Sequence, residues 1–471
     1  MNSEPVNAYQ IELQWTIKLI RIIKFSAMLA AISLMSGTIC AGDITKENET
    51  NVWKNYFSNF IVSGYIENES AYRLHSPQQF SKVQNLLQLE VKGEVMDYVD
   101  FYVMTWVMYD AAYDIYPDDY PDKVRDEYKS NFTADEAIDQ IFREVYFDVL
   151  LDSMDIRLGK QQVVWGEAIG LRITDVVNPQ DYREFILDDF IDSRIPLWMG
   201  KLNYYLNDWT FEGLWIPFFE PNRFALAGSE WEWTFNRFDP PGGMQVIVND
   251  PDEPTTGLEN GEFGGRAYGL IAGWNISTSY LYAWDDSPAR HARFDPSTFT
   301  LNFDQRYHRM HVVGFTFANA FGRFVPRGEF SYNLGKYFST ADQTDTDGLK
   351  EKDFLYYMIG TDYSISDFFF NTQFIQKIIT DYEEGIYEDQ VQNNLSLWIQ
   401  GKFINETLKP ELLTIYGPND GSWLIRPKVA YDFTDHVVVT TGIDILEGPP
   451  RSFFGQFDTN DRIYVEFKYS F

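Results

Sequence analysis

The chain has 471 residues, with 38 Lys and Arg against 70 Asp and Glu, and a net charge of −32. This balance excludes a nucleic-acid-binding protein, because no basic surplus is present to neutralise phosphates. Aromatic residues make up 17% of the chain and hydrophobic residues 45%. That composition excludes intrinsic disorder, and no apolar run is long enough for a membrane-spanning helix.

The N-terminal residues have the pattern of a secretory signal peptide. Basic residues precede an uncharged run at 25–39, and small residues follow it. A basic segment, a short apolar core and a small-residue cleavage site are the parts of such a peptide. We therefore expect a signal peptide over 1–41, whose removal takes away the only cysteine, Cys40. A periplasmic segment is expected over 42–58.

From residue 59 onward, apolar and polar residues alternate in many short segments. The pattern is clear in 99–109, 145–151, 395–403 and 423–433. Period-two alternation places the apolar side chains on one face of a strand. Segments of this kind, separated by turns, are typical of a transmembrane β-barrel with an apolar outer face and a polar interior.

Short polar turns join these segments in pairs, and longer connections lie between the pairs, as in outer-membrane barrels. Eight hairpins give sixteen strands, and strands near 60–73 and 459–471 bring the total to eighteen. We therefore predict an all-β fold, a closed antiparallel transmembrane β-barrel of about 18 strands (16 as the alternative) over 59–471, with both termini in the periplasm. The predicted turns are Asp97-Tyr98, Asp152-Ser153, Asn207-Asp208, Asn275-Ile276-Ser277, Asn319-Ala320, Ser366-Asp367, Asn405-Glu406 and Thr434-Asp435.

Two long connections carry helix signals. Residues 133–136 begin with a Thr N-cap and have an acid at the third helical position. Asn178-Pro179 has a capping residue followed by the residue that suits the first turn, and apolar residues at helical spacing follow until Pro196. Because a structureless loop of this length is unusual, we interpret 166–198 as a helical insert folded into the lumen.

The last strand carries a membrane signal. Five apolar residues from Ile463 to Phe471 alternate with polar ones, and the chain ends on the aromatic Phe471. Such an ending resembles the signal by which the outer-membrane assembly machinery recognises its substrates. The alternative is an ordinary edge strand, but an exposed apolar edge invites aggregation. We expect a protein of the Gram-negative outer membrane, in contact with its lipid and lipopolysaccharide.

Two stretches carry a family resemblance. Residues Arg157–Trp198 read RLGKQQVVWGEAIGLRITDVVNPQDYREFILDDFIDSRIPLW, and Phe211–Arg223 read FEGLWIPFFEPNR. Both resemble a domain-of-unknown-function family of proteobacterial outer-membrane β-barrel proteins. The resemblance implies a barrel across nearly the whole mature chain. It also implies an outer-membrane lipoprotein and an efflux-type inner-membrane transporter as partners, with a role in moving apolar compounds or lipids.

Alternation also predicts which polar residues face the lumen. Both charge signs occur, so we expect a mixed-charge wall, not a simple anion or cation filter. These residues either set selectivity or pair with one another and with the insert, since charges are tolerated on an inner face. They are Arg157, Gln161, Lys201, Glu212, Arg323, Arg327, Glu329, Lys402, Arg426, Lys428, Asp432 and Asp444.

The insert itself is rich in charge. We expect these residues to lock it to wall cations and to form a gate, with Asp188 or Asp189 as the pairing acid. A permanent structural plug is the rival interpretation. The gate residues are Arg172, Asp175, Asn178, Asp181, Arg183, Asp188, Asp189 and Arg194.

Catalytic and metal motifs are weak. None of the five histidines belongs to a G-x-S-x-G elbow, and the acidic run 345–347 fails the calcium-loop pattern at its first and twelfth positions. We expect no enzyme, no cofactor and no metal. Three functions are weighed: a channel or transporter for small or apolar solutes gated by the insert; a closed component of a lipid or efflux transport assembly; and a lipid hydrolase or protease.

Overall fold

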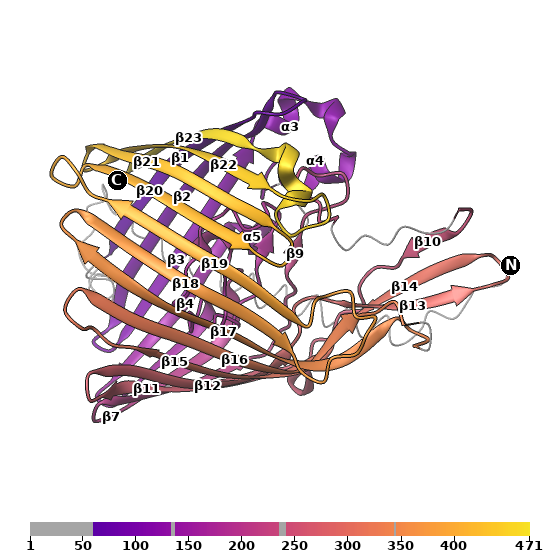
Figure 1. Cartoon of the computed structure of the whole chain (residues 1–471). Helices are drawn as coiled ribbons and strands as arrows, with labels where there is room; N and C mark the ends of the chain where they lie inside the picture. The colour runs from indigo at the N-terminus through magenta and orange to yellow at the C-terminus, as the bar shows by residue number, and fades with distance from the viewer. Residues whose placement is uncertain (1–59, 133–136, 235–241, 343–344) are drawn as a thin grey trace, which may run out of the picture. The chain divides into compact units, whose positions relative to one another are not determined.

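A computed structural model describes residues 60–132, 137–234, 242–342 and 345–471. Its main feature is one antiparallel sheet of 18 strands that closes on itself (Figure 1). Closure occurs where β1 (Ile61–Arg73) pairs with β23 (Arg462–Ser470). The predicted 18-stranded barrel is therefore confirmed. The expected signal peptide, the segment 42–58 and the helix start at 133–136 lie outside the described residues.

Each barrel strand pairs with the strand before it and the strand after it in the wall. Between β1 and β23 the wall consists of β2 (Phe80–Met96), β3 (Val99–Asp110), β4 (Phe142–Leu151), β5 (Met154–Gln161), β7 (Leu197–Leu206), β8 (Trp209–Ile216), β11 (Glu262–Ile271), β12 (Trp274–Trp284), β15 (Arg309–Ala318), β16 (Phe324–Ser339), β17 (Leu349–Ile365), β18 (Phe368–Ile379), β19 (Val391–Gly401), β20 (Leu408–Gly417), β21 (Ser422–Thr434) and β22 (Val437–Glu447).

The outer face of the wall is apolar, as the alternation predicts. On β23, Ile463, Val465 and Phe467 are 41–48% exposed, whereas Arg462 and Tyr464, which alternate with them, are buried. At the end of the chain, the backbone of Phe471 exchanges two hydrogen bonds with that of Gly64 on β1. The apolar side chains thus face lipid while their polar neighbours face the lumen.

The predicted turns are found within about one residue of their places, with two exceptions. The hairpin between β15 and β16 turns at Gly322-Arg323, closed by the bridge between Phe321 and Phe324, and not at Asn319-Ala320. The hairpin between β11 and β12 turns at Ala272-Gly273, because Ile271 pairs with Trp274. Gly273 has a φ of 86° and Ala272 a φ of 50°, the left-handed values that a two-residue hairpin turn requires. Asn275 was wrongly placed in the turn because it is a turn-forming residue type; here it belongs to β12.

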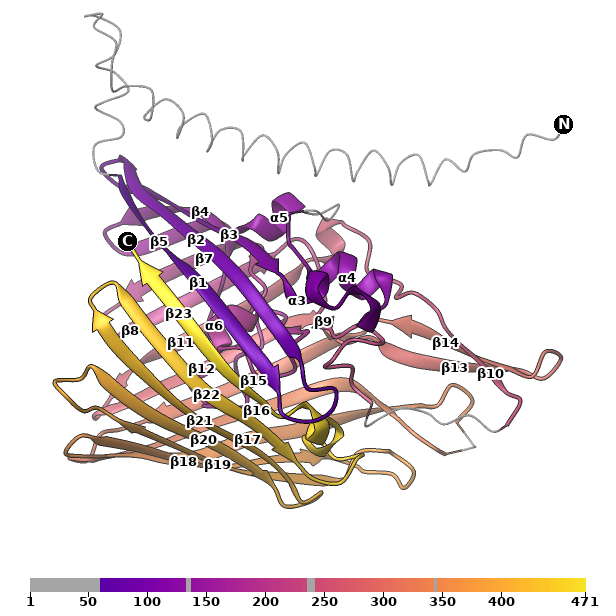
Figure 2. The same cartoon turned by 90° about the horizontal axis from the view of Figure 1, so that it is seen from above.

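All the short turns lie at one end of the barrel, together with the start of β1 and the end of β23, and the long connections lie at the other end (Figure 1). Two long connections meet in a small sheet, in which β14 (Thr300–Arg306) pairs with β10 (Gln245–Val248) and β13 (Ala289–Asp295). This sheet extends beyond the long-loop end (Figures 1 and 2). The sequence predicts only long loops here. The three strands have no continuous buried face, so their sequences lack the sustained apolar–polar alternation that predicts a strand.

The connection 111–141 holds the short helices α3 (Ala112–Ile115), α4 (Asp122–Tyr128) and α5 (Ala137–Ile141) with a 3-10 turn, η2 (Pro117–Asp119). The 3-10 turns η3 (Leu258–Asn260) and η4 (Gly455–Asn460) lie in two others. Among the described residues, no helix has the length and apolar composition needed to cross a bilayer.

The connection 162–196 contacts the inner wall, as expected, but it is not helical. It contains β6 (Asp181–Tyr182), which pairs with β9 (Arg223–Phe224), and a single helical turn, α6 (Phe190–Ser193). Asn178 does not cap a helix. Its Oδ1 accepts a hydrogen bond from Val163 N at 2.7 Å, and its Nδ2 donates to Ile195 O at 2.8 Å. The Asn178 amide therefore ties together the two ends of the insert.

Candidate functional site in the barrel lumen

The insert 162–196 packs against three sectors of the inner wall through apolar side chains. Near its start, Trp165 and other buried residues contact β7, β8, β12 and β15. Farther on, Ile173 packs on Met358 of β17 and Ile375 of β18. Phe185 then reaches Ile415 of β20 and its neighbours on β21 and β22. Contacts around so much of the wall place the insert inside the lumen.

The wall carboxylate Glu329 accepts several hydrogen bonds from the first half of the insert. Glu329 of β16 is 1% exposed, and it accepts hydrogen bonds from the backbone N–H of Glu167 and from Thr174 Oγ1, the latter at 2.8 Å. A Cβ at Gly166 would lie 3.1 Å from Glu329 Oε2 and 2.9 Å from Asp175 N. Glycine at this position permits the close approach that satisfies the buried charge.

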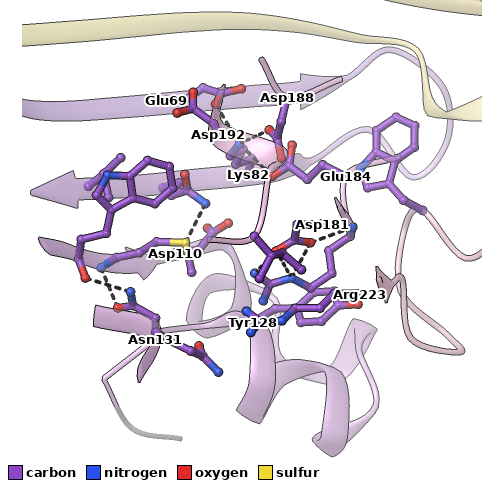
Figure 3. Close-up of a pocket in the computed structure, with 18 of the residues that line it drawn as sticks. Glu69, Lys82, Asp110, Tyr128, Asn131, Asp181, Glu184, Asp188, Asp192 and Arg223 are labelled. Carbon is purple, nitrogen blue, oxygen red and sulfur yellow. Dashed lines mark hydrogen bonds and ion pairs between the residues drawn. The ribbon is translucent and has the colours of Figure 1, made fainter. Parts of the chain in front are cut away.

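An ion-pair network holds the middle of the insert to β1, β2 and β23. Lys82 Nζ lies 2.8 Å from Glu69 Oε2 and 2.7 Å from Glu184 Oε1 (Figure 3). Arg462 Nη1 lies 3.3 Å from Glu184 Oε2. The side chains of Lys82 and Arg462 are 5% and 3% exposed. Glu184 therefore joins the insert to two buried wall cations, a geometry in which loss of one partner is costly.

The last part of the insert is held through its backbone. Arg143 of β4 donates hydrogen bonds to the carbonyl oxygens of Ile191, Asp192 and Arg194 at 2.7, 2.6 and 3.0 Å. Its guanidinium also lies 3.7 Å from the ring centroid of Trp106. This arrangement orients α6 without using its carboxylates.

Next to Glu184, the middle of the insert packs into an aromatic cluster. Phe185 is 1% exposed and contacts Trp233, Phe453, Phe454 and Phe457, with ring centroids 4.7–6.0 Å apart. Its φ is 57°, a left-handed conformation that is costly for a bulky residue. Burial of the ring stabilises this backbone conformation, and the cluster joins the insert to two of the long connections.

Between the insert and the wall at β1–β3 lies a cavity of about 190 Å³ (Figure 3). Nine carboxylates and seven cations line it. The carboxylates are Glu67, Glu69, Asp110, Asp139, Asp181, Glu184, Asp188, Asp192 and Glu230, and the cations are Lys82, Arg143, Lys160, Arg183, Arg194, Arg223 and Arg462. Among the described residues, no group of three His, Cys, Asp or Glu has the arrangement of a metal site.

Burial shifts several of these acids. It raises the pKa of Asp192 to about 6 and that of Glu230 to about 7. Burial, together with the charge of Glu184, raises the pKa of Asp188 well above its ordinary value. Although burial also acts on Glu184, Lys82 and Arg462 hold the pKa of that carboxyl below its ordinary value. Glu184 is thus satisfied as an anion, whereas the other three acids are not.

Most of the predicted lumen residues lie on the inner wall and are paired there. Four predicted wall cations have carboxylate partners on neighbouring strands, Asp432 pairs with Lys409, and Glu212 accepts a hydrogen bond from Trp165 Nε1 at 2.5 Å. Lys201 lies opposite Arg157 in the register of β5 and β7, and Gln161 donates to Met199 O. The ion pairs are Arg157–Asp148, Arg327–Asp362, Arg426–Asp444, Lys428–Glu411 and Lys409–Asp432.

Two of the predicted lumen residues are wrong. Arg323 lies in the exposed turn between β15 and β16, and Lys402 follows β19 and pairs with Glu406 in the next turn at 3.0 Å. Alternation was extended past the ends of the strands at both positions. Neither residue lines the wall.

The predicted gate residues divide into internal and wall contacts. Arg172 and Arg194 both pair with Asp175, at 3.3 and 2.7 Å, and Arg183 pairs with Asp181 at 2.5 Å. These five charges hold the insert together without reaching the wall through those ion pairs.

The lock to the wall includes one of the two predicted acids. Asp188 pairs with Lys82 at 4.0 Å, whereas Asp189 is exposed. The principal acid is Glu184, and the wall residues Lys82, Glu69 and Arg462 were missed. Period-two alternation along β1, β2 and β23 is the signal that could have identified these three.

This fold defines a porin-type outer-membrane β-barrel with a folded insert in its lumen. Three solved structures of similar fold come from Pseudomonas aeruginosa, each with a TM-score of 0.50: OccK3 (OpdO), at 10% identity over 89% of this chain and 97% of that one; OccK2 (OpdF) in complex with glucuronate, at 8% over 88% and 97%; and OccK8 (OprE), at 8% over 88% and 99%.

The chain belongs to the family described as "Protein of unknown function (DUF1302)", which matches residues 75–416. The family resemblance inferred from the sequence is thereby confirmed. No curated protein matches the sequence.

Proposed function

We propose that this protein is a channel of the Gram-negative outer membrane for small solutes, and that the insert 162–196 narrows and gates its lumen. One observation carries the proposal: the insert is closely packed against most of the wall but leaves a charged cavity of about 190 Å³ on the β1–β3 side. An unfilled, polar space inside a barrel is the expected form of a solute path.

The gate rests on the contrast between the insert's two kinds of contact. Glu329 and the apolar contacts of Phe185 hold the insert without using the charges of the cavity, although Trp231 of the same cluster lines the cavity. At the cavity, the insert is held by the Lys82–Glu184 pair and by Arg143. Breaking the cavity-side contacts alone would let this part of the insert move while the rest stays docked.

Single-channel recording of the purified, folded barrel in a planar bilayer tests the proposal. We expect small, stable conductance steps for the natural protein and larger or more frequent openings for Glu184→Gln, because the insert then loses its charge link to Lys82 and Arg462. Asp152→Asn, in an exposed hairpin turn, is the matched control. Silence of both the natural protein and Glu184→Gln, with folding shown by heat-modifiable gel mobility, would refute the channel.

A closed component of a transport assembly is the second candidate. The aromatic cluster favours it, because Phe185, Trp231, Phe454 and Phe457 form a buried apolar layer between the insert and the long connections. In this case the barrel would conduct only with a partner, and a lipoprotein and an efflux-type transporter stay the predicted partners. Copurification from membranes with such a partner, together with a silent purified barrel, would support this candidate over the channel.

An enzyme is less well supported by the placement of the histidines. His75 lies 3.2 Å from Asp461, His311 bonds Tyr280, and His436 bonds the backbone of Ser470. His291 and His308 contact each other near the small external sheet. None of the five is among the residues that line the lumen cavity.

A further inference from the structure

The lumen cavity holds more carboxylates than the cations beside them can neutralise. Three of its seven cations pair with acids outside the lining: Arg194 with Asp175 at 2.7 Å, Arg223 with Glu220 at 2.9 Å, and Arg462 with Asp444 at 2.8 Å. Arg143 donates its hydrogen bonds to backbone carbonyl groups of the insert. Two cations outside the lining compensate in part, since Lys468 pairs with Glu67 at 2.6 Å and Arg73 lies 3.6 Å from Glu230. The nine carboxylates still outnumber the cations available to them.

The missing positive charge is concentrated at three acids. Asp188 Oδ1 is 4.0 Å from Lys82 Nζ, beyond hydrogen-bond distance. Asp192 has no ion-pair partner within 4 Å in the part of the chain that the structure describes. Glu230 is 8% exposed at its side chain, its Oε1 accepts no hydrogen bond from any described residue, and Arg73 Nε lies 3.6 Å away. A buried carboxylate oxygen without a donor is costly.

Apolar groups lie in the same cavity. Leu86, Met108 and Trp106 line it from the wall strands, and Tyr113 and Tyr128 line it from the long connection after β3. Methylene groups of a ligand would be buried against these side chains, and aromatic faces attract cations. A bare inorganic ion would leave this apolar surface without contacts.

We propose that the cavity binds a small organic cation, an alkylamine whose ammonium groups take the places of donors at Asp188, Asp192 and Glu230. The inference deepens the proposed channel by naming the class of solute, and it rests on that proposal for its biological meaning. Binding itself needs only the folded barrel.

Isothermal titration calorimetry of the folded barrel in detergent tests the inference with 1,4-diaminobutane as the probe. Butane-1,4-diol and succinate are the neutral and anionic controls of the same chain length. We expect the diamine to bind and both controls to give no heat of binding. Asp188→Asn combined with Asp192→Asn should weaken binding by about tenfold or more, because charge-assisted hydrogen bonds are lost. Asp152→Asn in the exposed turn should bind as the natural protein does.

Each outcome decides the matter. Equal binding of succinate, no binding of the diamine, or unchanged affinity in the folded double variant would overturn the inference. Complete displacement of the diamine by millimolar K⁺ would show an inorganic-ion site instead. If the diamine binds but bilayers stay silent, the channel fails and the cation site stands. If the barrel conducts without binding the diamine, only the cation site fails.

Discussion

Two consecutive residues of the insert show how differently its two sides are held. Glu184 points to buried Lys82 and Arg462 beside a charged cavity, whereas Phe185 enters an aromatic cluster. The aromatic contact buries apolar surface and leaves no space, so it fixes the insert without selectivity. The strength of the charged contact depends on the ionisation of Glu184 and on how many cations pair with it. We call the contacts of Phe185 the permanent side of the insert, and the contacts at Lys82 and Arg462 its adjustable side.

Removal of the aromatic anchor should have the largest effect. Phe185→Ala deletes a fully buried ring, and large-to-small changes of this kind cost about 3–5 kcal/mol. We expect the insert to detach from β20–β22 and trypsin to cleave at its arginines, which the natural protein protects. Phe294→Ala, at an exposed ring on β13, is the control and should leave the digestion pattern unchanged. Unaltered protection in Phe185→Ala would show that the aromatic side does not anchor the insert.

Loss of the wall cation Lys82 should have the second-largest effect. Lys82→Met leaves Glu69 and Glu184 buried with less compensation, and breaking a buried pair costs about 3 kcal/mol, at the low end because Arg462 still faces Glu184. The expected result is frequent channel opening with the aromatic side still protected from trypsin. Lys123→Met, on an exposed helix, should behave as the natural protein does. If Lys82→Met opens the barrel no more than Lys123→Met, the adjustable side does not lie at this pair.

A smaller effect is expected at Glu329. Glu329→Gln keeps the shape of the side chain but loses the charge that accepts hydrogen bonds from Glu167 N and Thr174. Hydrogen bonds to a charged group contribute about 1.5–3 kcal/mol, of which the amide oxygen retains a part. Amide hydrogen exchange at 167 and 174 should therefore accelerate, with the remainder of the insert unchanged. Equal exchange rates in the two proteins would contradict the role given to this carboxylate.

The sequence predicts the wall well because alternation is a local property of each strand. The apolar set of β23 could be read directly, and inner-wall residues such as Glu329 and Arg426 follow from the same period. The insert could not be read in this way. Its apolar residues recur at helical spacing near 185–191, but Phe185 has a left-handed φ and packs into contacts that come from four distant segments. Tertiary contacts override the local helix preference there. They also determine that Glu184, more than Asp188, pairs with the buried wall cations.

The smallest expected effect is a pH dependence of the adjustable side. Burial raises the pKa of Asp192, in the insert, to about 6 and that of Glu230, in the connection after β8, to about 7, so the docked arrangement binds protons that these acids release when the insert moves away. Docking should therefore strengthen as the pH falls from 8 to 5, and channel openings should become rarer. Glu184 does not oppose this trend, because its pKa lies below the ordinary value and its ion pairs persist through that window. Asp192→Asn combined with Glu230→Gln should reduce the pH dependence of the opening frequency between 5 and 8, and Asp188, whose pKa burial also raises, carries the rest. An unreduced dependence in this variant would assign the titration to other groups.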